Sequence, residues 1–85
     1  MKKNIVVKIK EKRREDIPIE TEFIRLDAFL KLSGAVVTGG EAKEHVQAGE
    51  IRVNEEVCIQ RGKKLRPGDS VQLENIIYTV TERDQ

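Results

Sequence analysis

Residues 26–53 read LDAFLKLSGAVVTGGEAKEHVQAGEIRV, and this stretch decides the fold because the spacing of its apolar residues changes along it. Its first part carries apolar residues at helical intervals, namely Leu26, Phe29, Leu30 and Leu32. A glycine such as Gly34 can end a helix in the left-handed conformation. The pattern therefore predicts a short helix over about 26–33.

A second helix is predicted over about 39–48. Thr38-Gly39-Gly40-Glu41 has the form of a capping box. In that motif the Thr38 hydroxyl accepts from the Glu41 amide, while the Glu41 carboxylate reaches back to the amide of Thr38. The core-facing residues of this helix are Ala42 and Val46, one turn apart, and Gly49 ends it.

Two strands are expected next, over 51–53 and 57–59, with Asn54-Glu55-Glu56 between them. A two-residue loop would place Val53 opposite Glu56, an apolar side chain against a charged one. We therefore expect three looped residues, or two and a bulge, which aligns Val53 with Val57 and turns Cys58 away from the core.

The later part of the chain predicts a turn and two more strands. Pro67-Gly68 fits the centre of a type II turn, because proline presets the first φ and glycine accepts the positive second one. Alternation over 71–73 predicts one strand, Glu74-Asn75 a turn, and alternation over 76–81 the last strand.

The first part of the chain predicts a strand over 4–10, where apolar and polar residues alternate, and a charged loop over 11–16. Residues 17–23 alternate too, but Pro18 cannot donate to a ladder and restricts them to an edge or a strand start. The fold class is therefore α+β: two short helices packed on a small, mostly antiparallel sheet of four to five strands. We expect residues 1–85 to form a single domain.

Charge is distributed unevenly along a chain whose formal net charge is only +1. Residues 61–66, RGKKLR, hold four positive charges, and residues 1–14 hold seven. Clustered Lys and Arg attract phosphates, so both segments favour a polyanion as partner. The alternative for each is a solvated run that offsets nearby acids. For residues 1–14 we favour that alternative, since lysines also protect an edge strand.

No catalytic or metal site is predicted. Cys58 is the only cysteine and His45 the only histidine, and neither has a partner at the spacing of a metal site or a catalytic pair. We expect no enzyme activity, no cofactor and no small-molecule substrate. The single cysteine and the lack of a long apolar run also predict a cytoplasmic protein without a membrane partner. The aromatic residues are assigned to the core: Phe23, Phe29 and Tyr78.

Four short motifs occur in a distinctive order. They are Arg25-Leu26-Asp27, Ala42-Lys43, Gly49-x-Ile51-x-Val53-Asn54 and Leu65-x-Pro67-Gly68-Asp69. The ordered set resembles the S-four-type RNA-binding domain, also called the alpha-L motif, over residues 24–73, with 4–10 and 76–81 as added strands. The runs TGG-x-AK at 38–43 and RGKKL at 61–65 further resemble small stand-alone bacterial members of this family, called YaaA-like or YbcJ-like.

The resemblance implies a non-enzymatic protein that holds structured RNA, such as ribosomal or transfer RNA, and that associates with the ribosome or its precursors. It also implies that Lys43 and the basic loop at 61–66 contact phosphates. We expect a monomer. The candidate RNA-binding residues are Arg25, Lys31, Thr38, Gly39, Gly40, Lys43, Arg52, Arg61, Lys63, Lys64 and Arg66.

Several of these residues have a second interpretation. The start of the second helix offers unpaired amides to a phosphate, but Gly39 and Gly40 could equally serve close packing against the first helix. Arg25 could contact RNA or pair with Asp27. The family usually has Ser-Arg in place of Thr38-Gly39, so one phosphate-binding arginine is missing here. It usually has Asn-Gly where this chain has Asn54-Glu55.

A different class of function is a protein-interaction adaptor. Such a protein would use an exposed sheet edge or the acidic segment 15–29, with the basic loop as a charged rim.

Overall fold

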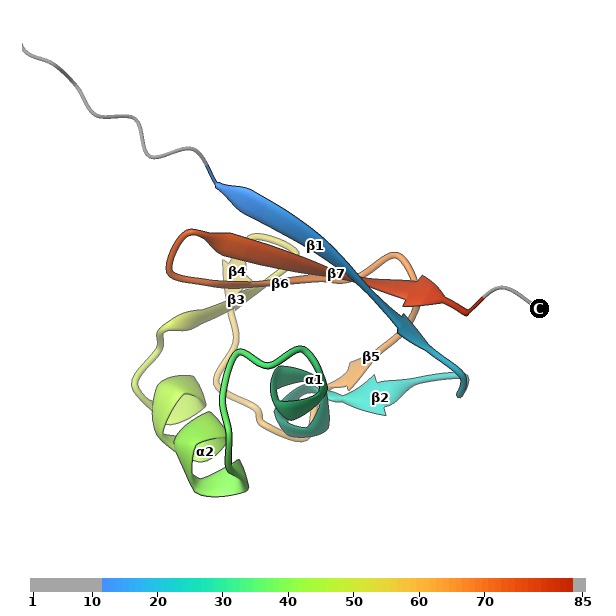
Figure 1. The fold of residues 1–85 in the computed structure, drawn as a ribbon. Coiled ribbons are helices and arrows are strands. Elements are labelled where there is room, and N and C mark those ends of the chain that lie inside the picture. Colours follow the sequence, from blue (N-terminus) through green and yellow to red (C-terminus); the bar gives the residue numbers. More distant parts are fainter. Residues whose placement is uncertain (1–11, 84–85) are drawn as a thin grey trace, which may run out of the picture.

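The computed structural model describes residues 12–83, which contain two helices and seven strands (Figure 1). In chain order these are β1 (Arg13–Ile19), β2 (Ile24–Arg25), α1 (Leu26–Leu32), α2 (Gly39–Gln47), β3 (Ile51–Val53), β4 (Glu56–Val57), β5 (Lys64–Leu65), β6 (Ser70–Leu73) and β7 (Ile76–Glu82). The strand predicted over 4–10 lies outside the described residues. The α+β class is confirmed.

The main sheet has five strands in the order β1-β7-β6-β3-β4, and β2 pairs with β5 in a separate two-stranded ribbon. Every pairing is antiparallel except that of β1 with β7. The expectation of a mostly antiparallel sheet with two helices on it is therefore confirmed.

The prediction of a charged loop over 11–16 is wrong from Arg13 onward, because Arg13 begins the strand β1. In the pairing of β1 with β7, Arg13 lies opposite Ile76 and Ile19 opposite Glu82. An edge strand needs only one ladder and tolerates charged side chains, so its charge did not prevent pairing. Pro18 lies on this edge strand, as expected of a residue without an amide proton.

One core joins the helices to the inner face of the sheet. Its fully buried members include Leu26, Phe29, Leu30, Ala42, Val46, Ile51, Leu65, Val71 and Val80. Tyr78 also belongs to this core, but Phe23 is only half-buried, so its assignment to the core is wrong. Because the inner face is covered, alternate residues along the central strands face solvent on the other side of the sheet.

The helix ends follow the predicted signals. Gly34 after α1 and Gly49 after α2 both have positive φ, at 84° and 76°. The Thr38 hydroxyl accepts from the Glu41 amide at 3.1 Å, as a capping box requires. The Glu41 carboxylate, however, accepts from the amide of Val37 at 2.8 Å, one residue before the expected amide of Thr38.

The hairpin between β3 and β4 differs from the prediction. Val53 pairs with Glu56, so the loop has two residues, Asn54 and Glu55, and no bulge. Both have positive φ, 50° and 76°, which suits the tight turns that join twisted strands. The apolar-against-polar pair is tolerated because Glu56 is exposed on the short edge strand β4.

The turn at Pro67-Gly68 is confirmed. Gly68 has φ of 103°, and the Asp69 amide donates to the Arg66 carbonyl at 2.9 Å. The Asp69 carboxylate in turn accepts from the Arg66 amide at 2.8 Å. This turn ends the basic loop and starts β6. Between residues 12 and 83, no helix is long and apolar enough to cross a membrane.

Candidate RNA interface

The basic segment, defined as residues Arg61–Arg66, is bonded to the start of α1. The Leu26 amide donates to the Lys63 carbonyl at 2.8 Å, and the Asp27 amide donates to the Arg61 carbonyl at 3.0 Å. The first amides of a helix have no partner within the helix, so these bonds satisfy them. They hold the start of α1 against the basic segment, although the bonded residues are more than 30 positions apart in the sequence.

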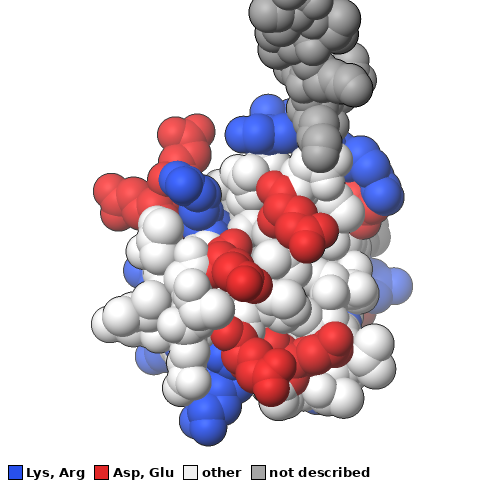
Figure 2. All heavy atoms as spheres, turned by 90° about the vertical axis from the view of Figure 1, so that its left-hand side faces the viewer, with Lys and Arg blue, Asp and Glu red and all other residues white. Residues whose placement is uncertain are grey.

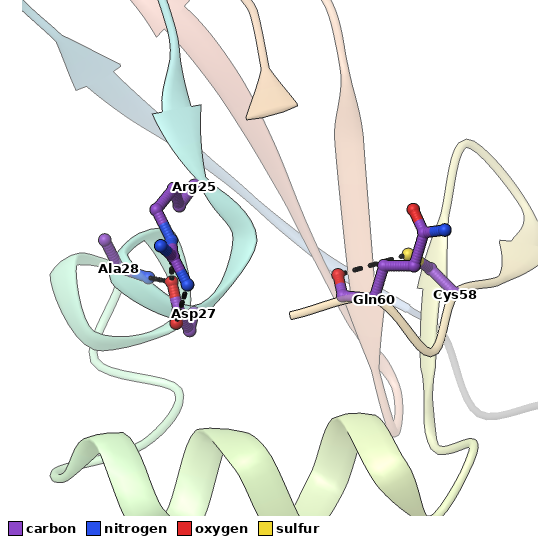
Figure 3. Close-up of polar contacts among 5 residues, drawn as sticks. All are labelled: Arg25, Asp27, Ala28, Cys58 and Gln60. Atoms are coloured by element: carbon purple, nitrogen blue, oxygen red, sulfur yellow. Dashed lines mark hydrogen bonds and ion pairs between the residues drawn. The ribbon is translucent and has the colours of Figure 1, made fainter. Parts of the chain in front are cut away.

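Arg25 lies at this junction. Its guanidinium holds the Asp27 carboxylate through two bonds, Nε to Oδ1 at 3.1 Å and Nη2 to Oδ2 at 3.0 Å (Figure 3). A Cβ added at Gly62 would lie 3.5 Å from Nη2, so Arg25 also contacts the basic segment. Its side chain is still 56% exposed, and the paired guanidinium keeps donors free for a phosphate.

The β2–β5 ribbon places Arg25 beside Lys64 of the basic segment. Ile24 pairs with Leu65, which is fully buried, while Arg25 pairs with the exposed Lys64. The Lys64 ammonium lies 4.8 Å from the centre of the Phe23 ring, and the Arg66 guanidinium lies 5.7 Å from it. Phe23 therefore supports two cations of the interface through its ring. Sequence reasoning assigned Phe23 to the core, whereas alternation from Phe23 through Ile24 to Arg25 is a signal that would have placed Phe23 on the same side as Arg25.

The start of α2 leaves its two glycines open. A Cβ added at Gly39 would meet nothing within 4 Å, and one at Gly40 only the Thr38 hydroxyl at 3.9 Å. Close packing against α1 therefore does not explain either glycine. Lys43, one turn further along α2, is exposed beside the buried Ala42. The amides of Gly39 and Gly40 carry the positive end of the helix dipole toward this open surface.

The charges of the basic segment are not neutralised by acids between residues 12 and 83. The ion pairs there join Arg13 to Glu15, Arg25 to Asp27, His45 to Glu50 and Arg83 to Glu20. None of them uses the exposed cations Lys31, Lys43, Arg61, Lys63, Lys64 and Arg66. The alternative in which the basic loop merely offsets neighbouring acids therefore has no support in this part of the chain.

Two of the candidate residues lie apart from the others. Lys31 is in the last turn of α1, about 9 Å along the helix from Arg25. Arg52 is exposed on β3 between the buried Ile51 and Val53, so it points away from the helices. The structure thus brings together Arg25 and the basic segment, with the start of α2 on the helix packed against α1 (Figure 1).

Acidic and basic side chains occupy different parts of one face of the molecule. Figure 2 shows the side of the molecule that lies on the left in Figure 1, where Asp and Glu gather down the middle and Lys and Arg lie toward the margins. A phosphate would meet repulsion in the middle of this face. The cations at its margins and on other faces are therefore the ones to consider for phosphate contact.

Cys58 is oriented opposite to the prediction. It packs against the core, while Val57 and Ile59 are 53% and 66% exposed, because the two-residue loop shifts the register by one. Its thiol donates to the Gln60 carbonyl at 3.7 Å (Figure 3). His45 Nδ1 lies 2.6 Å from Glu50 Oε1. No three potential metal ligands gather among residues 12–83.

Comparison with known protein families identifies the family of this chain. A family model described as S4 domain matches residues 17–81. The chain belongs to the S4 domain family. The resemblance drawn from the motifs is thereby confirmed. The match also extends beyond residues 24–73 in both directions, so it includes the last three residues of β1 and nearly all of β7.

Among curated proteins, this S4 domain chain is similar to a "Probable ribosome maturation protein RlbA" of Bacillus subtilis (strain 168). The two are 45% identical over 58 residues, which cover 68% of this chain and 82% of the relative. The alignment thus covers most of the relative's length.

Proposed function

We propose that this protein binds structured RNA, and ribosomal RNA in the first instance, by contacting phosphates with Arg25, the basic segment and the start of α2. It does so as a monomer and without catalysis. The observation that carries the proposal is the attachment of the basic segment to α1 through the carbonyls of Arg61 and Lys63, beside the guanidinium of Arg25. Four exposed cations and a half-exposed arginine are thereby held in one place.

Phosphate contacts fit this surface better than base stacking. Phe29 and Tyr78 are buried, and the ring of Phe23 already lies under Lys64 and Arg66. Proteins that read single-stranded RNA bases use open aromatic platforms, which this surface lacks. Fixed cations along a small rigid domain suit the phosphates of a folded RNA.

The name of the Bacillus subtilis relative supports a role in ribosome maturation. The S4 domain family supports the RNA-binding part of the proposal. We therefore place the protein's action in the cytoplasm, on ribosomal RNA or on a precursor of the ribosome.

Binding across a salt series tests the proposal. About four phosphate contacts give a log–log salt slope near −3 to −4. The variant Lys63→Ala with Lys64→Ala should flatten the slope by about 2 and weaken binding of a ribosomal RNA fragment. Arg13→Ala with Arg83→Ala is the matched control, since it removes the same charge from ion-paired positions. Equal behaviour of both variants would contradict the proposed site.

The adaptor alternative rests on β1, which forms one edge of the five-stranded sheet. The acidic segment that an adaptor would also use, residues 15–29, has fewer unpaired carboxylates than its composition indicates. Three of its five carboxylates, those of Glu15, Glu20 and Asp27, are paired with arginines. Capture of partners with and without ribonuclease distinguishes the two functions. An adaptor would keep its partner after nuclease treatment and in the Lys63→Ala, Lys64→Ala variant.

A further inference from the structure

A row of paired residues crosses the outer face of the main sheet. The strand registers place Arg14 opposite Ile77, Ile77 opposite Gln72, and Gln72 opposite Arg52. The neighbouring row contains the buried residues Tyr78, Val71 and Val53. Because successive residues of a strand point to opposite faces, the first row lies on the side of the sheet away from the helices.

This row forms the floor of a shallow hollow with positively charged walls. Lys12 and Arg14 line it from the β1 side and Arg52 from β3, with Ser70, Gln72 and Ile77 between them and Glu55 at the β3–β4 turn. Three strand spacings of about 4.8 Å put the α-carbons of Arg14 and Arg52 about 14 Å apart. The two long side chains can reach toward one another over the two strands between them.

The cations around this hollow are free of ion pairs between residues 12 and 83. Arg52 makes one weak contact, from Nη1 to the Glu55 carbonyl at 3.5 Å. Arg13, the neighbour of Arg14 on β1, shows the contrast, because its guanidinium is held by Glu15 at 2.6 Å. Within residues 12–83, Lys12 and Arg14 therefore keep their side-chain donors for a ligand, and Arg52 keeps all but the one that contacts Glu55.

We propose that this hollow is a second RNA-contacting surface, which takes backbone phosphates on the side of the sheet opposite the helices. The proposal rests on the proposed function and extends it, because it gives the protein two faces on which it can hold RNA. Three cations against the single carboxylate of Glu55 favour an anionic ligand. The polar floor of Ser70 and Gln72 offers hydrogen bonds to phosphate and sugar oxygens.

A peptide ligand fits this surface less well. The hollow has one partly buried apolar residue, Ile77, and no aromatic side chain among the residues that line it. An acidic peptide would gain only exposed charge pairs, which contribute little each. A polynucleotide gains from each phosphate by releasing counterions.

The test is a titration of the ¹⁵N-labelled full chain with a 20-base-pair RNA hairpin, followed by amide chemical shifts. We expect two sets of shifts, one at residues 39–43 and 61–66 and one at Arg14, Arg52, Gln72 and Ile77. The variant Arg14→Gln with Arg52→Gln should lose the second set alone and flatten the salt slope by about 2. Arg13→Gln with Arg83→Gln is the control of equal charge and should keep both sets.

The outcomes separate the two proposals. Shifts at 39–43 and 61–66 alone would overturn the second surface and leave the proposed function intact. No shift in either set would overturn both. A parallel titration with polyglutamate identifies the ligand class: shifts of the second set by polyglutamate but not by RNA would also overturn the proposal and indicate an acidic protein instead.

Discussion

The amide of Leu26 donates to the carbonyl oxygen of Lys63 at 2.8 Å, and through this bond the basic segment caps α1. Arg25, at the N-cap position, makes no capping bond with its own side chain. Because the cap comes from the basic segment, formation of α1 and positioning of the cations depend on each other. Substitutions at this junction should therefore affect stability and RNA binding together, unless only charge is changed.

Asp27→Asn should separate the two effects. It removes the carboxylate that Arg25 holds and a negative charge in the first turn of α1. We expect a loss of about 1 kcal/mol or less, because the pair is partly exposed, and a drop in melting temperature of several degrees. RNA affinity should be kept or rise, since the Arg25 guanidinium is released.

Arg25→Gln is the matched variant, because it breaks the same pair from the other side. It should lose similar stability but also RNA affinity. Thermal denaturation and RNA titration of both variants check this. If Asp27→Asn weakened binding as much as Arg25→Gln, the arginine would act through its fixed position and not through its available charge.

Gly39→Ala with Gly40→Ala should stabilise the fold and weaken RNA binding. The added methyl groups meet no neighbour closer than 3.9 Å, and alanine is favoured over glycine in a helix by up to about 1 kcal/mol per residue. The same methyl groups would crowd the amides offered to a phosphate. Urea denaturation and RNA titration measure the two effects. Gain of stability with unchanged affinity would remove the start of α2 from the interface.

Glu55→Gly should stabilise the hairpin. Glu55 has φ of 76°, a conformation that costs a non-glycine residue on the order of 1 kcal/mol and a glycine almost nothing. The change also removes the one carboxylate of the outer-face hollow, so RNA binding should strengthen. Glu56→Gly is the control with the same charge change in the strand β4. It should strengthen RNA binding less and destabilise the protein.

Ionisation of Tyr78 should lower the free energy of unfolding at alkaline pH. Burial, and then the negative charge of Glu15, raise the pKa of the Tyr78 hydroxyl above its ordinary value of 10.0. The folded protein thus holds this proton more tightly than the unfolded chain. The resulting stabilisation is complete below pH 10 and is lost as pH rises through the raised pKa.

Tyr78→Phe removes this titration, so its urea midpoint should fall less steeply above pH 10 than that of the wild type. The two proteins should run parallel between pH 7 and 9, where the hydroxyl is protonated in both states. Parallel curves over the whole range to pH 11 would show that other groups cause the alkaline loss.

Local signals in the sequence predicted the local structure well. Thr38, Gly34, Gly49 and Pro67-Gly68 act through a few neighbouring residues, and each ends or caps an element as expected. The predicted loop length of the β3–β4 hairpin was wrong, because the prediction required Val57 to be buried opposite Val53. On the two-residue edge strand β4 that burial is not required, so the tight turn at Asn54 and Glu55 set the register instead.

Long-range pairing could not be predicted from the pattern alone. The charged run beginning at Arg13 resembles a loop until β7 is placed beside it, and Lys64 and Leu65 form a strand only because Ile24 and Arg25 lie opposite. The same limit applies to the site. Its cations were identified from charge, but the separation of Arg52 from the basic segment depends on which face of the sheet each occupies.

The parallel pairing of β1 with β7 has a consequence for folding of the chain during its synthesis on the ribosome. Arg13 and its partner Ile76 are 63 positions apart, and β1 has no other strand partner among the described residues. Closing such a loop costs about 4 kcal/mol of chain entropy, which only the pairing of β1 with β7 can offset. A nascent chain must therefore carry β1 unpaired while β2 to β6 are synthesised, and its sheet is completed only when β7 has left the exit tunnel.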